Sequence, residues 1–315
     1  MSGCRPDPPQ GALEARTTAD GSLTLWSEHF GEAFHSGQGA HAEALNKFVA
    51  PAQLERFAAG SVLRVLDVCV GLGYNTAALL EAVEDRGLRI EWIGLELDPR
   101  PLGLALSNRA FRALWRPASL TALEQLHHEG RWSSGFWLLG DARTQLAQVL
   151  HAWEGQCDLV LHDAFSPGHC PELWTVEFLG GLARLLNPQG RLLTYCAAAA
   201  VREALRLAGL HLASIVSPDT PAGAAGDQRR VWCAGTAASP TPFAGLNAGS
   251  SGGNPPIRGL CPMEIDHLRS RAAEPYRDPD GNADAATIQR WRAERQRLHP
   301  GESTSAWRRR WGLAR

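Results

Sequence analysis

Short apolar runs alternate with longer segments of helical periodicity over most of the chain, and this alternation predicts its architecture. Each run is followed by a turn and then by an amphipathic stretch. Strands that alternate with helices in this way are joined by right-handed crossovers and form a mostly parallel sheet. We therefore expect an α/β, doubly wound core. Its predicted strands are Val62–Val68, Ile90–Leu95, Phe136–Leu139, Leu159–His162, Arg191–Tyr195 and His211–Val216, with Arg230–Cys233 as the last.

Three segments are predicted before this core. Residues 1–16 are rich in Pro, Gly and charge and show no periodicity, so we expect a flexible leader there. From Thr17 the chain alternates apolar and polar residues about an Asp20–Gly21 turn, which predicts a short β-hairpin. A helix is predicted from about Ala40 to Val49, where Pro51 is expected to end it.

After residue 236 the composition shifts to Ala, Gly, Ser and Pro, which predicts a linker. Helical segments are predicted beyond it, at Pro262–Leu268 and Asp284–Leu298. Residues 285–315 hold eight arginines against Glu294 and Glu302, a local charge of 8 − 2 = +6. The sequence therefore predicts a leader over 1–16, a main domain over 17–236, a linker over 237–256 and an arginine-rich helical extension over 257–315.

Composition limits the classes of function. With 44% hydrophobic and 20% charged residues and a net charge of −2, the chain is an ordinary globular protein, and any nucleic-acid site must be local. Lys47 is the only lysine among 31 basic residues, which we interpret first as a compositional bias. The seven cysteines form no C-x-x-C pair that would indicate a metal or a dithiol switch. We expect a cytoplasmic protein with no membrane segment, because neither a signal peptide nor an apolar span is present.

The first core strand runs directly into a Gly71-x-Gly73 turn, which a helix follows. Glycine here allows a tight turn and lets a ligand approach the backbone without a Cβ in the way. Thr76 occupies the position of the third glycine in the dinucleotide fingerprint, which argues against a pyrophosphate-containing cofactor. A tight turn without a ligand is the open alternative. We predict that both glycines bind a cofactor, together with Asp67 before the turn and Asn75 after it.

Acidic residues follow the next two predicted strands. Glu96 comes directly after the second apolar run, and a carboxylate there can bind both hydroxyls of a ribose. Asp98 fits a helix cap better. After the third strand, Asp141 is followed by the small residue Ala142, and its carboxylate can accept a hydrogen bond from an adenine amino group or cap the next helix. We therefore expect a nucleoside cofactor bound by Glu96, Asp141 and Ala142.

This series of residues at successive strand ends resembles the S-adenosylmethionine-dependent Rossmann-like methyltransferases, which implies S-adenosyl-L-methionine as the cofactor. In that fold the end of the next strand faces the transferred methyl group. Asp163, in the segment DLVLHDAFSPGHCPELW, lies there and is predicted to be the substrate-side carboxylate. His162 points to the other side of the strand and is predicted to be a hydrogen-bonded core residue. The loop after the strand supplies the predicted substrate-binding residues Phe165, Pro167 and Trp174.

A narrower resemblance rests on DGSLTLWSEHFGEAFHSGQGAHAEA, DVCVGLGYN, GDA and DAFSPGHCPELWT. Over about residues 17–236 these segments are similar to the methyltransferase half of the bifunctional MnmC family, without its oxidase half. The resemblance implies methylation of the primary amine of 5-aminomethyl(-2-thio)uridine at the wobble position of tRNA, with Asp163 as the catalytic carboxylate. Two segments depart from the family pattern: residues 33–36 read AFHS where relatives have Tyr-Phe-Ser, and the glycine turn reads Gly-Leu-Gly-Tyr-Asn where relatives often have Gly-Thr-Gly-Leu-Asn.

The implied partner is tRNA, whose anticodon loop presents accessible bases for aromatic and arginine side chains. The arginine-rich extension, with Trp307 or Trp311, is one candidate for that contact; an amphipathic helix docked on the core is the equal alternative. A separate oxidase or other modification enzyme would supply the aminomethyl group. Two other functions stay open: a methyltransferase or aminopropyl-type transferase acting on a small amine, and a non-catalytic RNA-binding protein.

Overall fold

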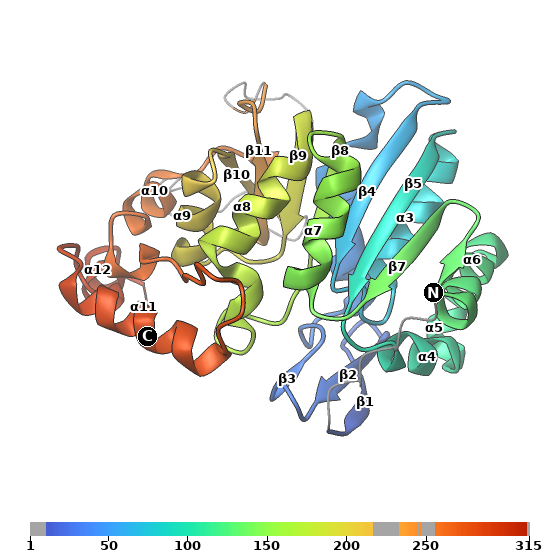
Figure 1. Ribbon diagram of the computed structural model, residues 1–315, viewed down its shortest axis with the longest axis horizontal. Coiled ribbons are helices and arrows are strands. Elements are labelled where there is room, and N and C mark those ends of the chain that lie inside the picture. Colours follow the sequence, from blue (N-terminus) through green and yellow to red (C-terminus); the bar gives the residue numbers. More distant parts are fainter. Residues whose placement is uncertain (1–10, 217–232, 245, 247–255, 314–315) are drawn as a thin grey trace.

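The computed structural model describes residues 11–216, 233–244, 246 and 256–313. A nine-stranded sheet forms its centre, in the order β12-β10-β11-β9-β8-β4-β5-β7-β6 (Figure 1). The neighbours from β9 to β7 are parallel, which confirms the α/β doubly wound core. The parallel strands are β4 (Val62–Val68), β5 (Arg89–Glu96), β7 (Gly135–Leu139), β8 (Cys157–His162) and β9 (Leu186–Thr194).

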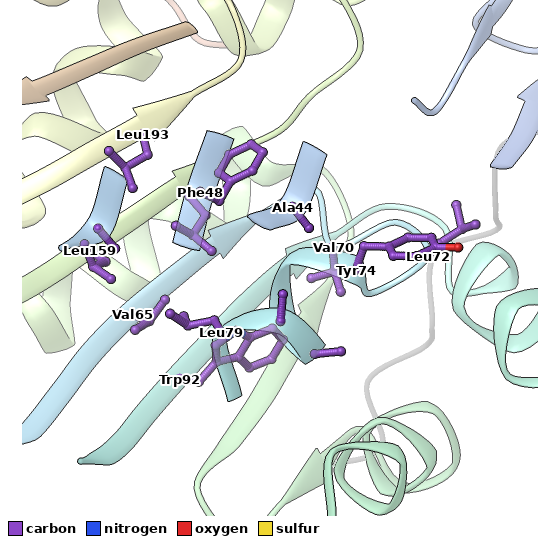
Figure 2. Packing of buried hydrophobic residues seen from close by; sticks show 14 of the residues in the cluster. Ala44, Phe48, Val65, Val70, Leu72, Tyr74, Leu79, Trp92, Leu159 and Leu193 are labelled. Carbon is purple, nitrogen blue, oxygen red and sulfur yellow. The ribbon is translucent and has the colours of Figure 1, made fainter. Parts of the chain in front are cut away.

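Helices cover both faces of the sheet because its central strands are apolar on both sides. In β4, Leu63 and Val65 belong to one buried cluster, and Leu66 and Val68 belong to the other. Figure 2 shows the first cluster, where Phe48 packs on the same face as Val65. That face carries α3 (Tyr74–Asp85) and α6 (Pro117–Glu129); the other carries α7 (Ala142–Trp153), α8 (Val176–Leu185) and α9 (Ala199–Leu207).

The last strands differ from the prediction. The strand expected at Arg230–Cys233 falls largely outside the described residues, and the chain instead forms β11 at Gly235–Ser239, antiparallel to β9. The expected boundary at residue 236 therefore falls inside a strand. The residues of β11, GTAAS, are small, are all buried and show no alternation, so the hydrophobic pattern does not predict this strand. The other strands of this part and of the far edge are β10 (His211–Ile215), β12 (Ile257–Arg258) and β6 (Arg131–Trp132).

A small three-stranded antiparallel sheet precedes the core. It consists of β1 (Leu13–Thr17), β2 (Leu23–Ser27) and β3 (Glu32–Ala33), so the predicted hairpin is confirmed. The prediction of a leader up to residue 16 is wrong for residues 13–16, because they pair with β2 although most of their side chains are exposed. Exposed strands lack the alternation that reveals half-buried ones.

The predicted helix after the hairpin extends further than expected. It begins as α1 (Ala40–Glu43), widens into a π-helical segment, η1 (Ala44–Val49), and closes with α2 (Ala50–Ala52). Pro51 does not end the helix at Val49, because it stands in the first turn of the new α-helical register, where its missing N–H is tolerated.

The C-terminal extension is docked on the core. Its helices are α10 (Pro262–His267), α11 (Ala285–Leu298) and α12 (Thr304–Arg310). Trp307 is 2% exposed and stacks on His267, so of the two alternatives for this residue the structure favours docking on the core over contact with RNA. None of the described helices has the length and apolarity needed to cross a membrane. The remaining short helices are η2 (Leu54–Arg56), α4 (Arg100–Leu106), α5 (Arg109–Arg112), η3 (Pro171–Trp174) and η5 (Arg271–Ala273).

Candidate active site

A cavity of about 270 Å³ opens where the parallel strands end. Residues that follow four neighbouring strands line it: Gly71 after β4, Glu96 at the end of β5, Asp141 after β7 and Asp163 after β8. This is the edge of a doubly wound sheet at which ligands bind. The other lining residues include Leu13, Ser27, His29, Phe30, Phe34, Cys69, Asp98, Gly140, Ala142, Arg143, Phe165, Cys170, Glu172 and Leu173.

The glycine turn forms one wall of the cavity. Gly71 has a φ of 56°, which favours glycine, and a Cβ there would lie 3.3 Å from the ring of Phe34. Gly73 has a φ of 87°, but a Cβ on it would meet Leu102 of α4 at 3.0 Å. The first glycine therefore shapes the cavity, whereas the second allows the turn and its packing against a helix.

Glu96 presents its carboxylate at the centre of this edge. One oxygen accepts hydrogen bonds from the N–H groups of Leu97 and Asp98, and the other accepts one from Gly71, all at 2.8 Å. Burial raises the pKa of Glu96 to about 7, although these donors favour the ionised form. Because a carboxylate has about four acceptor positions, Glu96 retains capacity for a ligand hydroxyl.

Asp141 has the capping role that was one of its two predicted alternatives, and it also faces the cavity. Its side chain accepts a 2.9 Å hydrogen bond from the N–H of Arg143, so it caps α7, and it also lines the cavity. The Arg143 guanidinium binds the same carboxylate at 2.7 Å and reaches the buried carboxylate of Asp278 at 2.9 Å. The C-terminal extension is thereby tied directly to the site. Adenine binding by Asp141 stays a prediction.

Asp163 directly follows β8 and lines the cavity. The amide nitrogen Nδ2 of Asn75 donates a 2.8 Å hydrogen bond to Oδ2 of Asp163. Burial raises the pKa of Asp163 to about 7, and the hydrogen bond from Asn75 opposes that rise. The structure thus provides a carboxyl group that gains and loses a proton near neutral pH, which is the property required of a general base.

Five residues predicted at the site do not line the cavity in the described part of the chain: Asp67, Gly73, Asn75, Pro167 and Trp174. Two of them support its walls from behind. Asp67 is buried and accepts a 2.7 Å hydrogen bond from Thr76 at the start of α3, and the Trp174 indole donates one of 2.7 Å to the carbonyl of Phe165. The sequence places these residues near the strand ends but does not indicate which side of a loop they face.

Aromatic side chains from the N-terminal hairpin complete the cavity. Phe30 stacks on Phe165 with ring centroids 4.3 Å apart, and Phe34 meets the same ring edge-on at 4.8 Å. The carboxylate of Glu32 accepts a 2.8 Å hydrogen bond from the N–H of Ser166, which ties the hairpin to the Phe165 loop. Of these three aromatic residues, the sequence analysis predicts only Phe165 as a binding residue. The signal it missed was the Phe-x-x-x-Phe spacing at residues 30 and 34.

His162 has the core role that the sequence predicted. Its side chain is fully buried, its Nε2 lies 2.9 Å from the carbonyl oxygen of Leu173, and its ring packs edge-on against Trp174. Burial lowers its pKa to about 4, so the imidazole is neutral at physiological pH. His162 therefore helps to hold the loop that follows Asp163.

Comparisons with known proteins agree with this geometry. A family model described as S-adenosyl-L-methionine-dependent methyltransferase matches residues 115–218. The chain is 31% identical over 204 residues to the tRNA 5-methylaminomethyl-2-thiouridine biosynthesis bifunctional protein MnmC of Azoarcus sp. (strain BH72), covering 60% of this chain and 31% of that protein. It is also 30% identical over 190 residues to an uncharacterized protein of Methanocaldococcus jannaschii, covering 60% of this chain and 51% of that one.

A solved structure extends the likeness to nearly the whole chain. The crystal structure of MNMC2 from Aquifex aeolicus superposes with a TM-score of 0.71 at 28% identity, covering 93% of this chain and 87% of that chain. The chain spans about a third to a half of the length of the two curated relatives named above.

Proposed function

Since this chain is an S-adenosyl-L-methionine-dependent methyltransferase of MnmC-like fold, we propose that it methylates the primary amine of 5-aminomethyl(-2-thio)uridine at the wobble position of tRNA. The product would be 5-methylaminomethyl(-2-thio)uridine. The observation that carries the proposal is Asp163, a carboxyl group with a pKa of about 7 that lines the cavity shared with Glu96 and Asp141. A tRNA substrate implies a cytoplasmic protein.

The residues that line the cavity fit the cofactor. Glu96 offers a carboxylate with spare acceptor capacity for ribose hydroxyls, Asp141 offers one for an adenine amino group, and the absent Cβ of Gly71 keeps the wall between them open. S-adenosyl-L-methionine supplies an activated methyl group on a sulfonium.

Asp163 performs the proton chemistry in this proposal. An alkylamine is mostly protonated near pH 7, and only its neutral form has the lone pair that attacks a methyl group. The Asp163 carboxylate accepts a hydrogen bond from the substrate ammonium, fixes its direction and takes its proton. Because Asn75 binds Oδ2, the carboxylate is held in one orientation while Oδ1 is left for the amine.

The aromatic residues suit a flipped-out base. Phe30, Phe34 and Phe165 form an apolar wall beside Asp163, and bases recognised in RNA loops stack on such side chains. A uracil ring held there would place the substituent on its C5 atom near the carboxylate. Of these three residues, Phe165 belongs to the loop that the sequence assigned to substrate binding.

Helix α11 supports RNA as the substrate class. Gln289 donates a 2.8 Å hydrogen bond to the carbonyl of Gly168, so this helix lies beside the Phe165 loop. Arg290, Trp291 and Arg297 are exposed on it, and within the described ranges no ion pair occupies Arg290 or Arg297. Guanidinium groups bind phosphates, and an exposed indole can stack on a base.

The test is transfer of labelled methyl from S-adenosyl-L-methionine to tRNA from cells that lack the modification, followed by nucleoside analysis. The expected result is labelled 5-methylaminomethyl(-2-thio)uridine. If the protein binds the cofactor but labels only free small amines, the small-amine alternative is correct and the tRNA proposal fails. Asp163→Ala serves as the inactive control, since it should still bind the cofactor.

A further inference from the structure

The only lysine of the chain occupies an unusual position. Lys47 lies in the π-helical segment η1, a widened turn of the kind that is frequent at functional sites. Elsewhere the chain builds its helical ion pairs with arginine, as in the Arg206–Glu203 pair of α9. An ion pair alone therefore does not require a lysine at residue 47. A compact ammonium differs from a guanidinium in shape and in the freedom of its donors.

Lys47 is held in place by Glu43. Its Nζ atom donates a 2.9 Å hydrogen bond to Oε1 of Glu43, and the two side chains are 21% and 16% exposed. The hydroxyl of Ser36 donates to the same carboxylate oxygen. Since an ammonium has three donors, and Glu43 is its one hydrogen-bond partner among the described residues, Lys47 retains donors for a ligand.

A short series of contacts connects Lys47 with Asp163. The Nζ atom lies 5.9 Å from the centre of the Tyr195 ring, directly after β9. The Tyr195 hydroxyl donates a 2.9 Å hydrogen bond to the carbonyl of Ala164, the residue after Asp163. Lys47 is thus at the ends of β8 and β9, where the reacting amine of the proposed substrate would lie.

Lys47 approaches this region from outside the cofactor cavity. Glu43, Lys47 and Tyr195 are partly exposed, and none of them belongs to the cavity lining among the described residues. The base of the methyl acceptor would lie on the aromatic wall of the cavity beside Asp163, so the rest of the nucleotide must leave the cavity on a different side from the cofactor. Lys47, its partner Glu43 and the Tyr195 ring are placed to form that side.

We infer that Lys47 binds the methyl acceptor by donating a hydrogen bond to an oxygen of the substrate nucleotide, either a base carbonyl or a phosphate. Glu43 and the Tyr195 ring hold the ammonium for this contact. The inference rests on the proposed function, because it takes an RNA nucleotide as the substrate. It adds a substrate-binding residue that lies some 116 positions before Asp163 in the chain and in a different element.

Variants separate substrate binding from a structural role. Lys47→Met should raise the KM for tRNA by about 10-fold or more, the usual effect of losing a charged hydrogen bond, and leave cofactor affinity unchanged. Lys47→Arg should recover part of the loss. Arg206→Met, which breaks an exposed helical pair, is the matched control and should have wild-type kinetics. The double variant Glu43→Gln/Lys47→Met removes both charges; if it regains the wild-type KM, the pair is structural and the inference is wrong.

The uniqueness of Lys47 permits a direct footprint. An amine-acetylating reagent has one side-chain target, Lys47, and the α-amino group of the chain is the internal reference. An anticodon stem-loop RNA should protect Lys47 and leave the α-amino group reactive. The slope of log affinity against log salt concentration identifies the atom that Lys47 contacts. If the slope for Lys47→Met is lower than that of the wild type by roughly 0.7–0.9, the contact is to a phosphate; if the slope is unchanged, the contact is to a base carbonyl.

The failures of the two proposals are distinguishable. A wild-type protein that transfers no methyl to tRNA overturns the proposed function, and this inference with it. If the wild type methylates tRNA, while acetylation of Lys47 is unaffected by RNA and Lys47→Met keeps its KM, the inference alone is overturned.

Discussion

The side-chain amide of Asn75 donates a 2.8 Å hydrogen bond to the carboxylate of Asp163, which joins the helix after the glycine turn to the end of β8. Asn75 was expected to contact the cofactor. That contact stays a prediction; the structure shows that Asn75 orients the group that would receive the substrate proton, and its donor favours the ionised form of that group.

The first prediction concerns the pH dependence of methyl transfer. Asp163 acts as a base only when it is ionised, and burial raises its pKa to about 7, so kcat/KM should rise with pH up to about 7. Asn75→Ala removes a donor that favours ionisation, so the rising limb should move to higher pH by roughly one unit. A pH profile of kcat/KM for both proteins measures this. If the rising limb of Asn75→Ala lies at the same pH as that of the wild type, Asn75 does not influence the ionisation of Asp163.

Asp163→Ala should lower turnover by about 100-fold or more, within the usual range for an acid–base group. Cofactor affinity, measured by calorimetry, should change little, because the proposed cofactor contacts are made by Glu96 and Asp141 at the ends of other strands. Turnover equal to that of the wild type would exclude Asp163 as the base.

Glu96→Gln should weaken cofactor binding by about 10-fold or more. Both oxygens of Glu96 accept backbone N–H groups, and an amide must turn its NH₂ group toward one of those donors while losing an acceptor for the ribose. Glu91→Gln, on the exposed part of the same strand, is the control and should bind normally. Calorimetric titration compares the cofactor affinities of the three proteins. If the affinities are equal, Glu96 does not bind the cofactor.

The helix α11 should contribute to tRNA affinity. Arg290→Gln/Arg297→Gln should weaken binding and lower the slope of log affinity against log salt by roughly 0.7–0.9 for each phosphate that the variant no longer binds. Arg112→Gln, on α5 at the opposite end of the molecule in Figure 1, also removes an exposed arginine and should leave the slope unchanged. If both variants behave alike, α11 is a solvated helix without a role in RNA binding.

Most of the parallel sheet could be predicted because buried parallel strands are apolar runs with turns between them. Because ligands bind at the carboxyl ends of such strands, the residues that follow them could also be predicted to line the site, namely Glu96, Asp141 and Asp163. The sequence could not reveal β11, whose residues are small, or β1, whose residues are exposed, since neither has the hydrophobic alternation of a half-buried strand.

The sequence also does not indicate that the N-terminal hairpin contributes residues to the site. Phe30 and Phe34 lie well over a hundred residues before Phe165, and only the folded chain brings the three rings together. The same holds for Arg143 and Asp278, which couple the cavity to the extension. Such long-range contacts follow from topology, which local periodicity does not determine.

The last prediction concerns the docking of the extension. Glu264 is buried and pairs with the buried Arg202 at 3.1 Å, so Glu264→Ala leaves a guanidinium without its counter-charge and should destabilise the protein by about 3–5 kcal/mol. Glu154→Ala, which breaks an exposed pair with Arg184, should have little effect. Urea unfolding at neutral pH measures both.

The difference in stability between the wild type and Glu264→Ala should disappear at acid pH. The guanidinium groups around Glu264 lower its pKa from 4.5 to about 2, although burial opposes them. A carboxyl whose folded-state pKa is depressed stabilises the folded state above its unfolded pKa and loses that contribution as the pH falls through the folded value. The gap in unfolding free energy between wild type and Glu264→Ala should therefore be constant above about pH 4.5 and shrink toward pH 2. A gap that is independent of pH over this range would mean that the lost stability comes from packing rather than from the charge of Glu264.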